Sequence, residues 1–167
     1  MNVIRVHAKV GKIQEAEAFA QEYAQYLNIE DENLLASIHA RAACHIGFEK
    51  GEYQAVLDNI EKIKVRDKPK HLIDRHIFYF KASYELGKTD NILDKEVTFS
   101  NYLKDNYERQ QLGLDYKICY QNFFDLLVMM INFRYEGYTK TLLLDKLHGF
   151  QGLVAESKWL KAKIAKL

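Results

Sequence analysis

Residues 37–69 read SIHARAACHIGFEKGEYQAVLDNIEKIKVRDKP, and this stretch decides the fold. Small residues, Ala43 and Cys44, lie in its first half, which ends near Gly51. Apolar side chains recur in its second half at Tyr53, Val56, Ile60 and Ile63. Intervals of three and four residues place side chains on one face of a helix. The stretch therefore predicts two antiparallel helices joined at the glycine.

Three further glycines divide the chain in the same way. Apolar-periodic stretches lie on both sides of Gly11, Gly87 and Gly137. After Gly87 the stripe is shifted by one residue and runs through Asp90, Leu93, Val97 and Ser100. Residues 114–135 are apolar around most of a helical circumference, which predicts a buried central helix.

A small residue, a turn glycine with an aromatic two positions later, and an apolar residue five positions after the glycine together resemble the tetratricopeptide repeat (TPR). Residues 37–69 give the best match. The chain is also similar to the C-terminal helical regions of larger uncharacterised bacterial proteins. The resemblance implies an all-α fold, a TPR-like α-α superhelix of antiparallel helical hairpins in a single domain. We expect repeat units at about 1–32, 33–70, 71–110 and 111–150, and a closing C-terminal helix at 153–166.

The first expected unit has apolar residues where a terminal repeat normally carries a polar cap. Val3, Ile4 and Val6 occupy its short first helix. This predicts that the N-terminal face is covered by a partner, by a second copy of the chain, or by preceding repeats of a longer array.

Composition excludes several classes of protein. Eight glycines and one proline among 167 residues supply too few turns for a β-sandwich, and a hydrophobic content of 48% excludes a disordered chain. The net charge of +1 argues against a nucleic-acid binder with a domain-wide basic footprint. The longest apolar run, 126–131, is too short to span a membrane. We expect a cytoplasmic protein in which Cys44 and Cys119 are buried thiols.

The sequence favours neither a catalytic nor a metal-binding role. His39, Cys44 and His45 are close in sequence, but their spacing points them in different directions around a helix, unlike the convergent ligands of a zinc site. Asp74 and His76 form a possible acid–base pair at an expected helix start, where a structural role is the simpler interpretation. No phosphate-binding glycine loop or nucleophile motif occurs. We expect no cofactor, no metal and no enzymatic activity.

If the TPR-like register holds, one side of each first helix lines a concave groove. Four residues on this side, Arg41, His45, Arg75 and Phe78, are the candidate partner-binding residues. Arginine and aromatic side chains often anchor interfaces, and paired arginines can grip a carboxylate. We therefore expect a protein-interaction or scaffolding module that binds a peptide or subunit. Packing within the array is the competing interpretation of these residues.

The alternative function is a regulatory or nucleic-acid-linked helical module. It would use the basic loop at 62–71 and the C-terminal lysines. Those lysines are Lys158, Lys161, Lys163 and Lys166. Lysines near a helix C-terminus also complement the helix dipole, which is the structural interpretation of the same residues.

Overall fold

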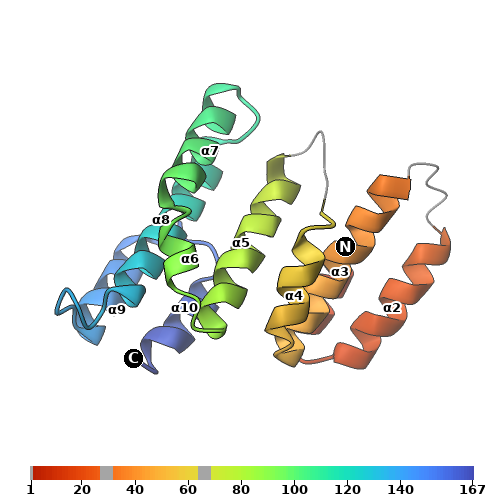
Figure 1. Cartoon of the computed structure of the whole chain (residues 1–167), viewed down its shortest axis with the longest axis horizontal. Coiled ribbons are helices and arrows are strands. Elements are labelled where there is room, and N and C mark those ends of the chain that lie inside the picture. Colours follow the sequence, from red (N-terminus) through yellow and green to blue (C-terminus); the bar gives the residue numbers. More distant parts are fainter. Residues whose placement is uncertain (1, 27–31, 64–68) are drawn as a thin grey trace. The chain divides into compact units, whose positions relative to one another are not determined.

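The computed structural model describes residues 2–26, 32–63 and 69–167 of the chain. Within these ranges it is helical and has no strand, which confirms the all-α class (Figure 1). The helices group into two compact units, Met1–Lys88 and Thr89–Leu167, each of which is described by itself. Among the helices of the described ranges, none has both the length and the apolar character needed to cross a membrane.

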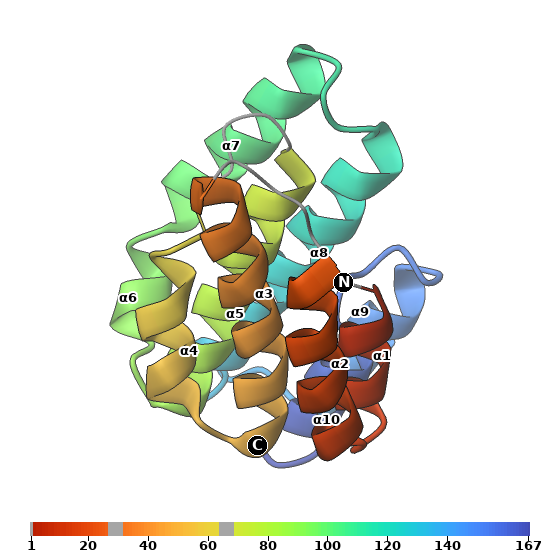
Figure 2. The ribbon, with the colours of Figure 1, turned by 90° about the vertical axis from the view of Figure 1, so that its right-hand side faces the viewer.

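The described residues of the first unit form five helices. They are α1 (Asn2–Lys9), α2 (Ile13–Tyr26), α3 (Glu32–Lys50), α4 (Tyr53–Ile60) and α5 (Pro69–Glu85). Helices α2 to α5 lie side by side in chain order (Figure 1), and α1 lies beside α2 (Figure 2). Each helix therefore packs against its neighbours in sequence.

A recurrent turn ends three helices. Gly11, Gly51 and Gly87 follow α1, α3 and α5 with positive φ angles of 80°, 78° and 70°. In each turn the residue after the glycine donates its N–H to the carbonyl oxygen five positions earlier, at 2.9, 2.8 and 2.8 Å. This is the Schellman motif, in which a glycine reverses the chain and satisfies the last carbonyls of the helix. The predicted turn positions are confirmed at all three glycines.

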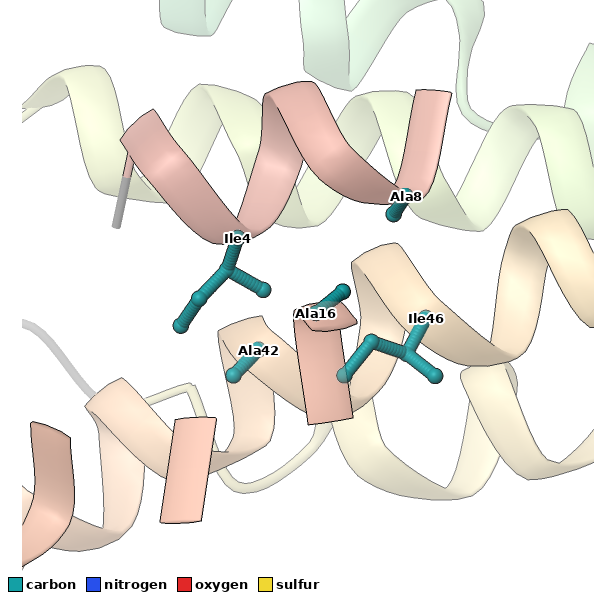
Figure 3. Packing of buried hydrophobic residues seen from close by; sticks show 5 residues of the cluster. All are labelled: Ile4, Ala8, Ala16, Ala42 and Ile46. Carbon is teal, nitrogen blue, oxygen red and sulfur yellow. The ribbon is translucent and has the colours of Figure 1, made fainter. Parts of the chain in front are cut away.

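Small side chains bring α1, α2 and α3 close together. Ile4 and Ala8 of α1 point toward Ala16, Ala42 and Ile46 (Figure 3), and all five side chains are buried. Alanines at the helix contacts let the backbones approach, while the two isoleucines supply most of the apolar surface. Ile4 therefore belongs to the unit's own core.

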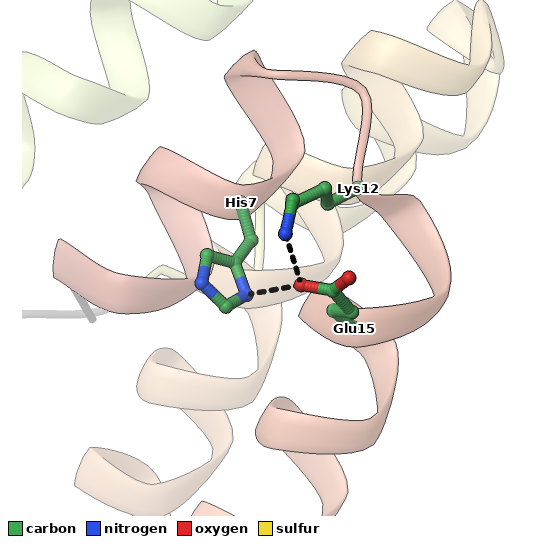
Figure 4. A network of polar contacts seen from close by, with 3 residues as sticks. All are labelled: His7, Lys12 and Glu15. Carbon is green, nitrogen blue, oxygen red and sulfur yellow. Dashed lines mark hydrogen bonds and ion pairs between the residues drawn. The ribbon is translucent and has the colours of Figure 1, made fainter.

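A group of polar contacts spans the turn between α1 and α2. The Glu15 carboxylate lies 3.1 Å from Lys12 Nζ and 3.7 Å from His7 Nδ1 (Figure 4). All three side chains are at least one-third exposed, so solvent screens this attraction and its contribution to stability is small.

The second unit also contains five helices. They are α6 (Asp90–Leu93), α7 (Glu96–Glu108), α8 (Leu114–Ile131), α9 (Lys140–Gly149) and α10 (Ser157–Ile164). Phe99 of α7 packs on Phe124 of α8 with ring centroids 5.3 Å apart, and Phe123 contacts Trp159 of α10 at 6.2 Å. The predicted central position of this apolar helix is confirmed for its C-terminal half, whereas Tyr116 in its first turn is 45% exposed.

Two details of the second unit differ from the prediction. The stripe expected after Gly87 is wrong, because the chain breaks between α6 and α7 and shifts the helical register. Ile92, Phe99 and Leu103 are buried instead, and Val97 is 71% exposed. The closing helix begins at Ser157 rather than at residue 153, because Leu153 and Ala155 form hydrogen bonds with α8.

Candidate functional site

Helices α3 and α5 meet along a seam that contains three of the four predicted partner-binding residues. Arg41 of α3 forms an ion pair with Asp74 of α5. The two side chains are 12% and 25% exposed, so the pair is shielded from most solvent. The Arg41 Nε atom is buried without a hydrogen-bond partner in the described part of the chain. Asp74 is therefore the principal polar partner of this guanidinium.

The next turns of the two helices continue the seam with aromatic contacts. The His45 ring meets Phe78 edge to face, with centroids 4.8 Å apart and an interplanar angle of 76°. One turn further, the buried Lys81 places its ammonium 4.0 Å from the centre of the Phe48 ring. The ion pair joins residues 33 positions apart, and both ring contacts have the same offset. α3 and α5 thus pack in parallel with a constant register.

Arg75 lies outside the line of these contacts. Its guanidinium donates to Glu61, just after α4, with an N–O distance of 2.8 Å. The Arg75 side chain is 35% exposed, whereas Phe78 is only 6% exposed. All four predicted residues have contacts within the first unit, and Arg75 is the one that presents a substantial charged surface to solvent.

The outer side of α1 carries a second candidate surface. Val3, Val6 and Val10 are 42%, 57% and 62% exposed. Their spacing of three and four residues puts them within about 60° of one another around the helix axis. We call these three residues the valine stripe. It faces away from the side on which Ile4 and Ala8 enter the core.

The two cysteines are free thiols; Cys44 is buried as predicted, whereas Cys119 is only partly buried. Burial raises the pKa of the Cys44 thiol to about 12, although the charges of Arg41 and Lys62 act in the opposite direction. The Cys44 Sγ lies 3.8 Å from the carbonyl oxygen of Val56, to which the thiol donates. Burial, and then the charge of Glu156, raise the pKa of Cys119. Both thiols stay protonated at neutral pH and are therefore poor nucleophiles.

The other histidines of interest are dispersed. His39 is exposed and Cys44 is buried, so the two occupy different faces of α3. His76 stacks on Phe80 with centroids 6.1 Å apart, while Asp74 pairs with Arg41. Across the residues that the structure describes, no group of three or more histidine, cysteine, aspartate or glutamate side chains is arranged to hold a metal ion.

Half of the basic loop at 62–71, residues 64–68, lies outside the described residues. Lys62 is described, and its Nζ lies 3.3 Å from the side-chain oxygen of Asn59. Among the C-terminal lysines, Lys158, Lys161 and Lys166 are exposed.

Comparison of the chain with protein-family models, with curated proteins and with solved structures finds no match. The site is therefore interpreted from its own geometry.

Sequence reasoning missed three participants in these surfaces. Asp74 and Glu61 pair with the candidate arginines from other helices, and no local spacing indicates such pairing. Val10 extends the stripe of Val3 and Val6 because the helical hydrogen bonding continues beyond Lys9, with the Val10 N–H donating to the Val6 carbonyl at 3.1 Å. The interval of three and four residues would have indicated Val10 if the helix had been extended to the turn.

Proposed function

We propose that this protein is a non-catalytic interaction module with a TPR-like array of helical hairpins, which binds another protein. The constant 33-residue offset between α3 and α5 supports the repeat, because it is close to the 34-residue TPR period. Lys50 and Glu17 pair across the same offset, and Lys88 and Gln54 across 34 residues. The same Schellman turn at Gly11, Gly51 and Gly87 also supports the repeat, because it ends α1, α3 and α5 in the same way.

The valine stripe is the observation that carries the binding function. Val3, Val6 and Val10 together present an apolar ridge on a helix whose opposite side is sealed in the core. In stacked repeats each hairpin covers the face of its neighbour, and this face of α1 is exposed. A ridge with intervals of three and four residues is the surface onto which another helix packs.

The charges around the valine stripe favour one kind of partner helix. α1 contains Arg5, His7 and Lys9 and no acidic residue. Two copies of α1 packed together would bring these basic groups near one another, which disfavours a symmetric dimer through this face. The occupant is an amphipathic helix of a partner protein, with an apolar stripe and glutamate or aspartate residues on its flanks.

The test measures binding of two synthetic helical peptides by fluorescence anisotropy. Both are about 18 residues long, roughly five helical turns, and share one leucine stripe. One has glutamates on its flanks and its twin has lysines. The full chain should bind the acidic peptide saturably and the lysine twin at least about tenfold more weakly.

Val6→Lys should weaken binding of the acidic peptide at least about tenfold, because it places a charge in the apolar contact. Val97→Lys is the matched control, since Val97 is also highly exposed but lies in the other unit. Circular dichroism checks that both variants fold. Equal affinity for the two peptides, equal loss in both variants, or no saturable binding would contradict the proposal.

The groove predicted from the sequence is a second candidate surface. Exposure of Arg75 supports it, since this guanidinium can reach a peptide carboxylate if it exchanges its partner Glu61. Arg41 and Phe78 are mainly packing residues, so their substitution would disturb the unit itself. Arg75→Glu separates the two surfaces, because it should leave binding at the valine stripe unchanged and abolish binding in the groove.

The nucleic-acid-linked alternative is tested by salt. Phosphate-driven binding weakens steeply as salt concentration rises, whereas binding of the acidic peptide, which is anchored by the apolar stripe, should weaken less. A steep salt dependence of binding to an oligonucleotide, with no binding of the acidic peptide, would favour the alternative.

A further inference from the structure

A small pocket lies between α9 and α10, within the second unit. Its volume is about 310 Å³. The buried side chains of Leu147 and Val154 contribute the apolar part of its lining. Small-molecule sites begin at about 300 Å³, so this pocket suits a small ligand.

The exposed part of the lining is basic. His148 of α9 and Lys158 and Lys161 of α10 contribute to it, together with the hydroxyl-bearing Ser157. Residues 157, 158 and 161 lie on one side of α10 because they are separated by one, three and four positions. Two helices thus bring three basic side chains and one hydroxyl to a single hollow.

These basic groups form no ion pair with the described residues. No described carboxylate lies within 4.0 Å of Lys158, Lys161 or His148, whereas Lys12, Lys50 and Lys104 all have such partners. Glu156 precedes Ser157, but it is not part of the lining, and its charge acts on the Cys119 thiol of α8. The pocket therefore favours an anion.

Hydrogen bonds fix the loop that forms one wall. Asn122 of α8 donates to the Leu153 carbonyl at 2.7 Å, and the Ala155 N–H donates to the Cys119 carbonyl at 3.0 Å. Val154 lies between these two bonds and is 6% exposed. The apolar wall is thus held in place before a ligand arrives, which reduces the entropy lost on binding.

We propose that this pocket binds a phosphate monoester of a small apolar molecule. The phosphate group contacts Lys158, Lys161 and Ser157, with His148 on the opposite wall. The apolar body packs on Leu147 and Val154. Phosphate offers several acceptor oxygens to converging donors, and hydrogen bonds between charged groups are the strong ones.

The test follows the backbone amide signals of the full-length chain by NMR. Phenyl phosphate supplies both parts of the ligand, inorganic phosphate supplies the anion alone, and phenol supplies the apolar ring alone. Phenyl phosphate should shift the amides of Gly152 and Ser157 saturably and bind more tightly than inorganic phosphate. Phenol should leave these signals unchanged.

The double variant Lys158→Gln/Lys161→Gln should have a lower affinity for phenyl phosphate, by about tenfold or more for each lysine removed. The control Lys146→Gln/Lys166→Gln removes the same charge from exposed residues of the same unit that do not line the pocket. It should retain wild-type affinity. Equal weakening in both double variants, or no saturable shift with millimolar phenyl phosphate, would overturn the proposal. So would an oligonucleotide that binds equally to both variants while phenyl phosphate does not bind.

Discussion

Arg41 and Asp74 form an ion pair between α3 and α5 across 33 residues of sequence. The pair lies in the seam between two parallel helices, followed on the next turn by the contact of His45 with Phe78. It therefore fixes the register of two helices that do not follow each other directly in the chain.

Removing one partner of this ion pair should destabilise the protein. Arg41→Ala leaves the Asp74 carboxylate without its partner in a shielded position, which should lower the free energy of unfolding by about 1–3 kcal/mol. Urea unfolding of Arg41→Ala, Asp74→Ala and the double variant measures the coupling between them. The pair of Lys104 and Glu108 is the control, since both side chains are about 60% exposed and should couple by less than about 1 kcal/mol. Equal coupling in the two pairs would contradict the importance given to burial.

Substitutions at two helix ends should act in opposite directions. Gly51 has a φ of 78°, and an added Cβ would meet nothing within 4 Å. Gly51→Ala should therefore cost about 1 kcal/mol for conformational reasons alone. Gln110 occupies the equivalent position after α7 with a φ of 58°, and its turn has the same hydrogen-bond pattern. Gln110→Gly should stabilise the protein by about 0.5–1 kcal/mol, because a left-handed conformation strains glutamine more than glycine.

Thermal and urea unfolding of the two variants check this prediction. Gly113→Ala is a useful control, because Gly113 is close to Gln110 but has an ordinary φ of −70°. It should change stability less than Gly51→Ala does. A stabilising Gly51→Ala or a destabilising Gln110→Gly would show that contacts, rather than backbone conformation, govern these turns.

Stability should fall in alkaline solution because of Cys44. Its folded-state pKa of about 12 lies above the ordinary value of 9.0 for a thiol, so the folded protein holds the thiol proton more tightly than the unfolded chain does. The resulting stabilisation is complete below pH 9 and is lost as pH rises from 9 toward 12, at up to about 1.4 kcal/mol per pH unit.

The measurement compares urea unfolding of wild type and Cys44→Ala between pH 8 and pH 10.5, values chosen to bracket the onset of ionisation. The difference in stability between the two proteins should shrink as pH rises. Cys119→Ala is the control, since Cys119 is less buried and should show a weaker pH dependence. A constant difference between wild type and Cys44→Ala would contradict the role given to this thiol.

The helical class and the main turns were predictable because they depend on local chemistry. Glycine at a helix end and apolar residues at intervals of three and four are signals within a few residues of each other. The register after Gly87 was not predictable in this way, because the break between α6 and α7 has neither a glycine nor a proline. The turn at Gln110 was hidden for the same reason, since glutamine does not normally mark a left-handed helix end.

The candidate site was less predictable than the fold. The expected repeat register assigned Arg41, His45 and Phe78 to a partner-binding groove, whereas in the structure they contact residues across the α3–α5 seam. The sequence did not reveal that Asp74 pairs with Arg41. Such a pairing depends on how one helix is displaced along another, which is determined by the packing of the whole hairpin. For the same reason the sequence did not bring His148 together with Lys158, because the loop that positions them has no recognisable motif.

The constant offset between α3 and α5 also affects how the chain folds. Contacts between residues 33 or 34 positions apart close loops of similar length, so each added pair of helices joins the preceding ones at a similar entropic cost. The contacts between α3 and α5 can form before more distant parts of the chain are synthesised or folded. The first unit can therefore form by accretion, one hairpin at a time, as the chain leaves the ribosome.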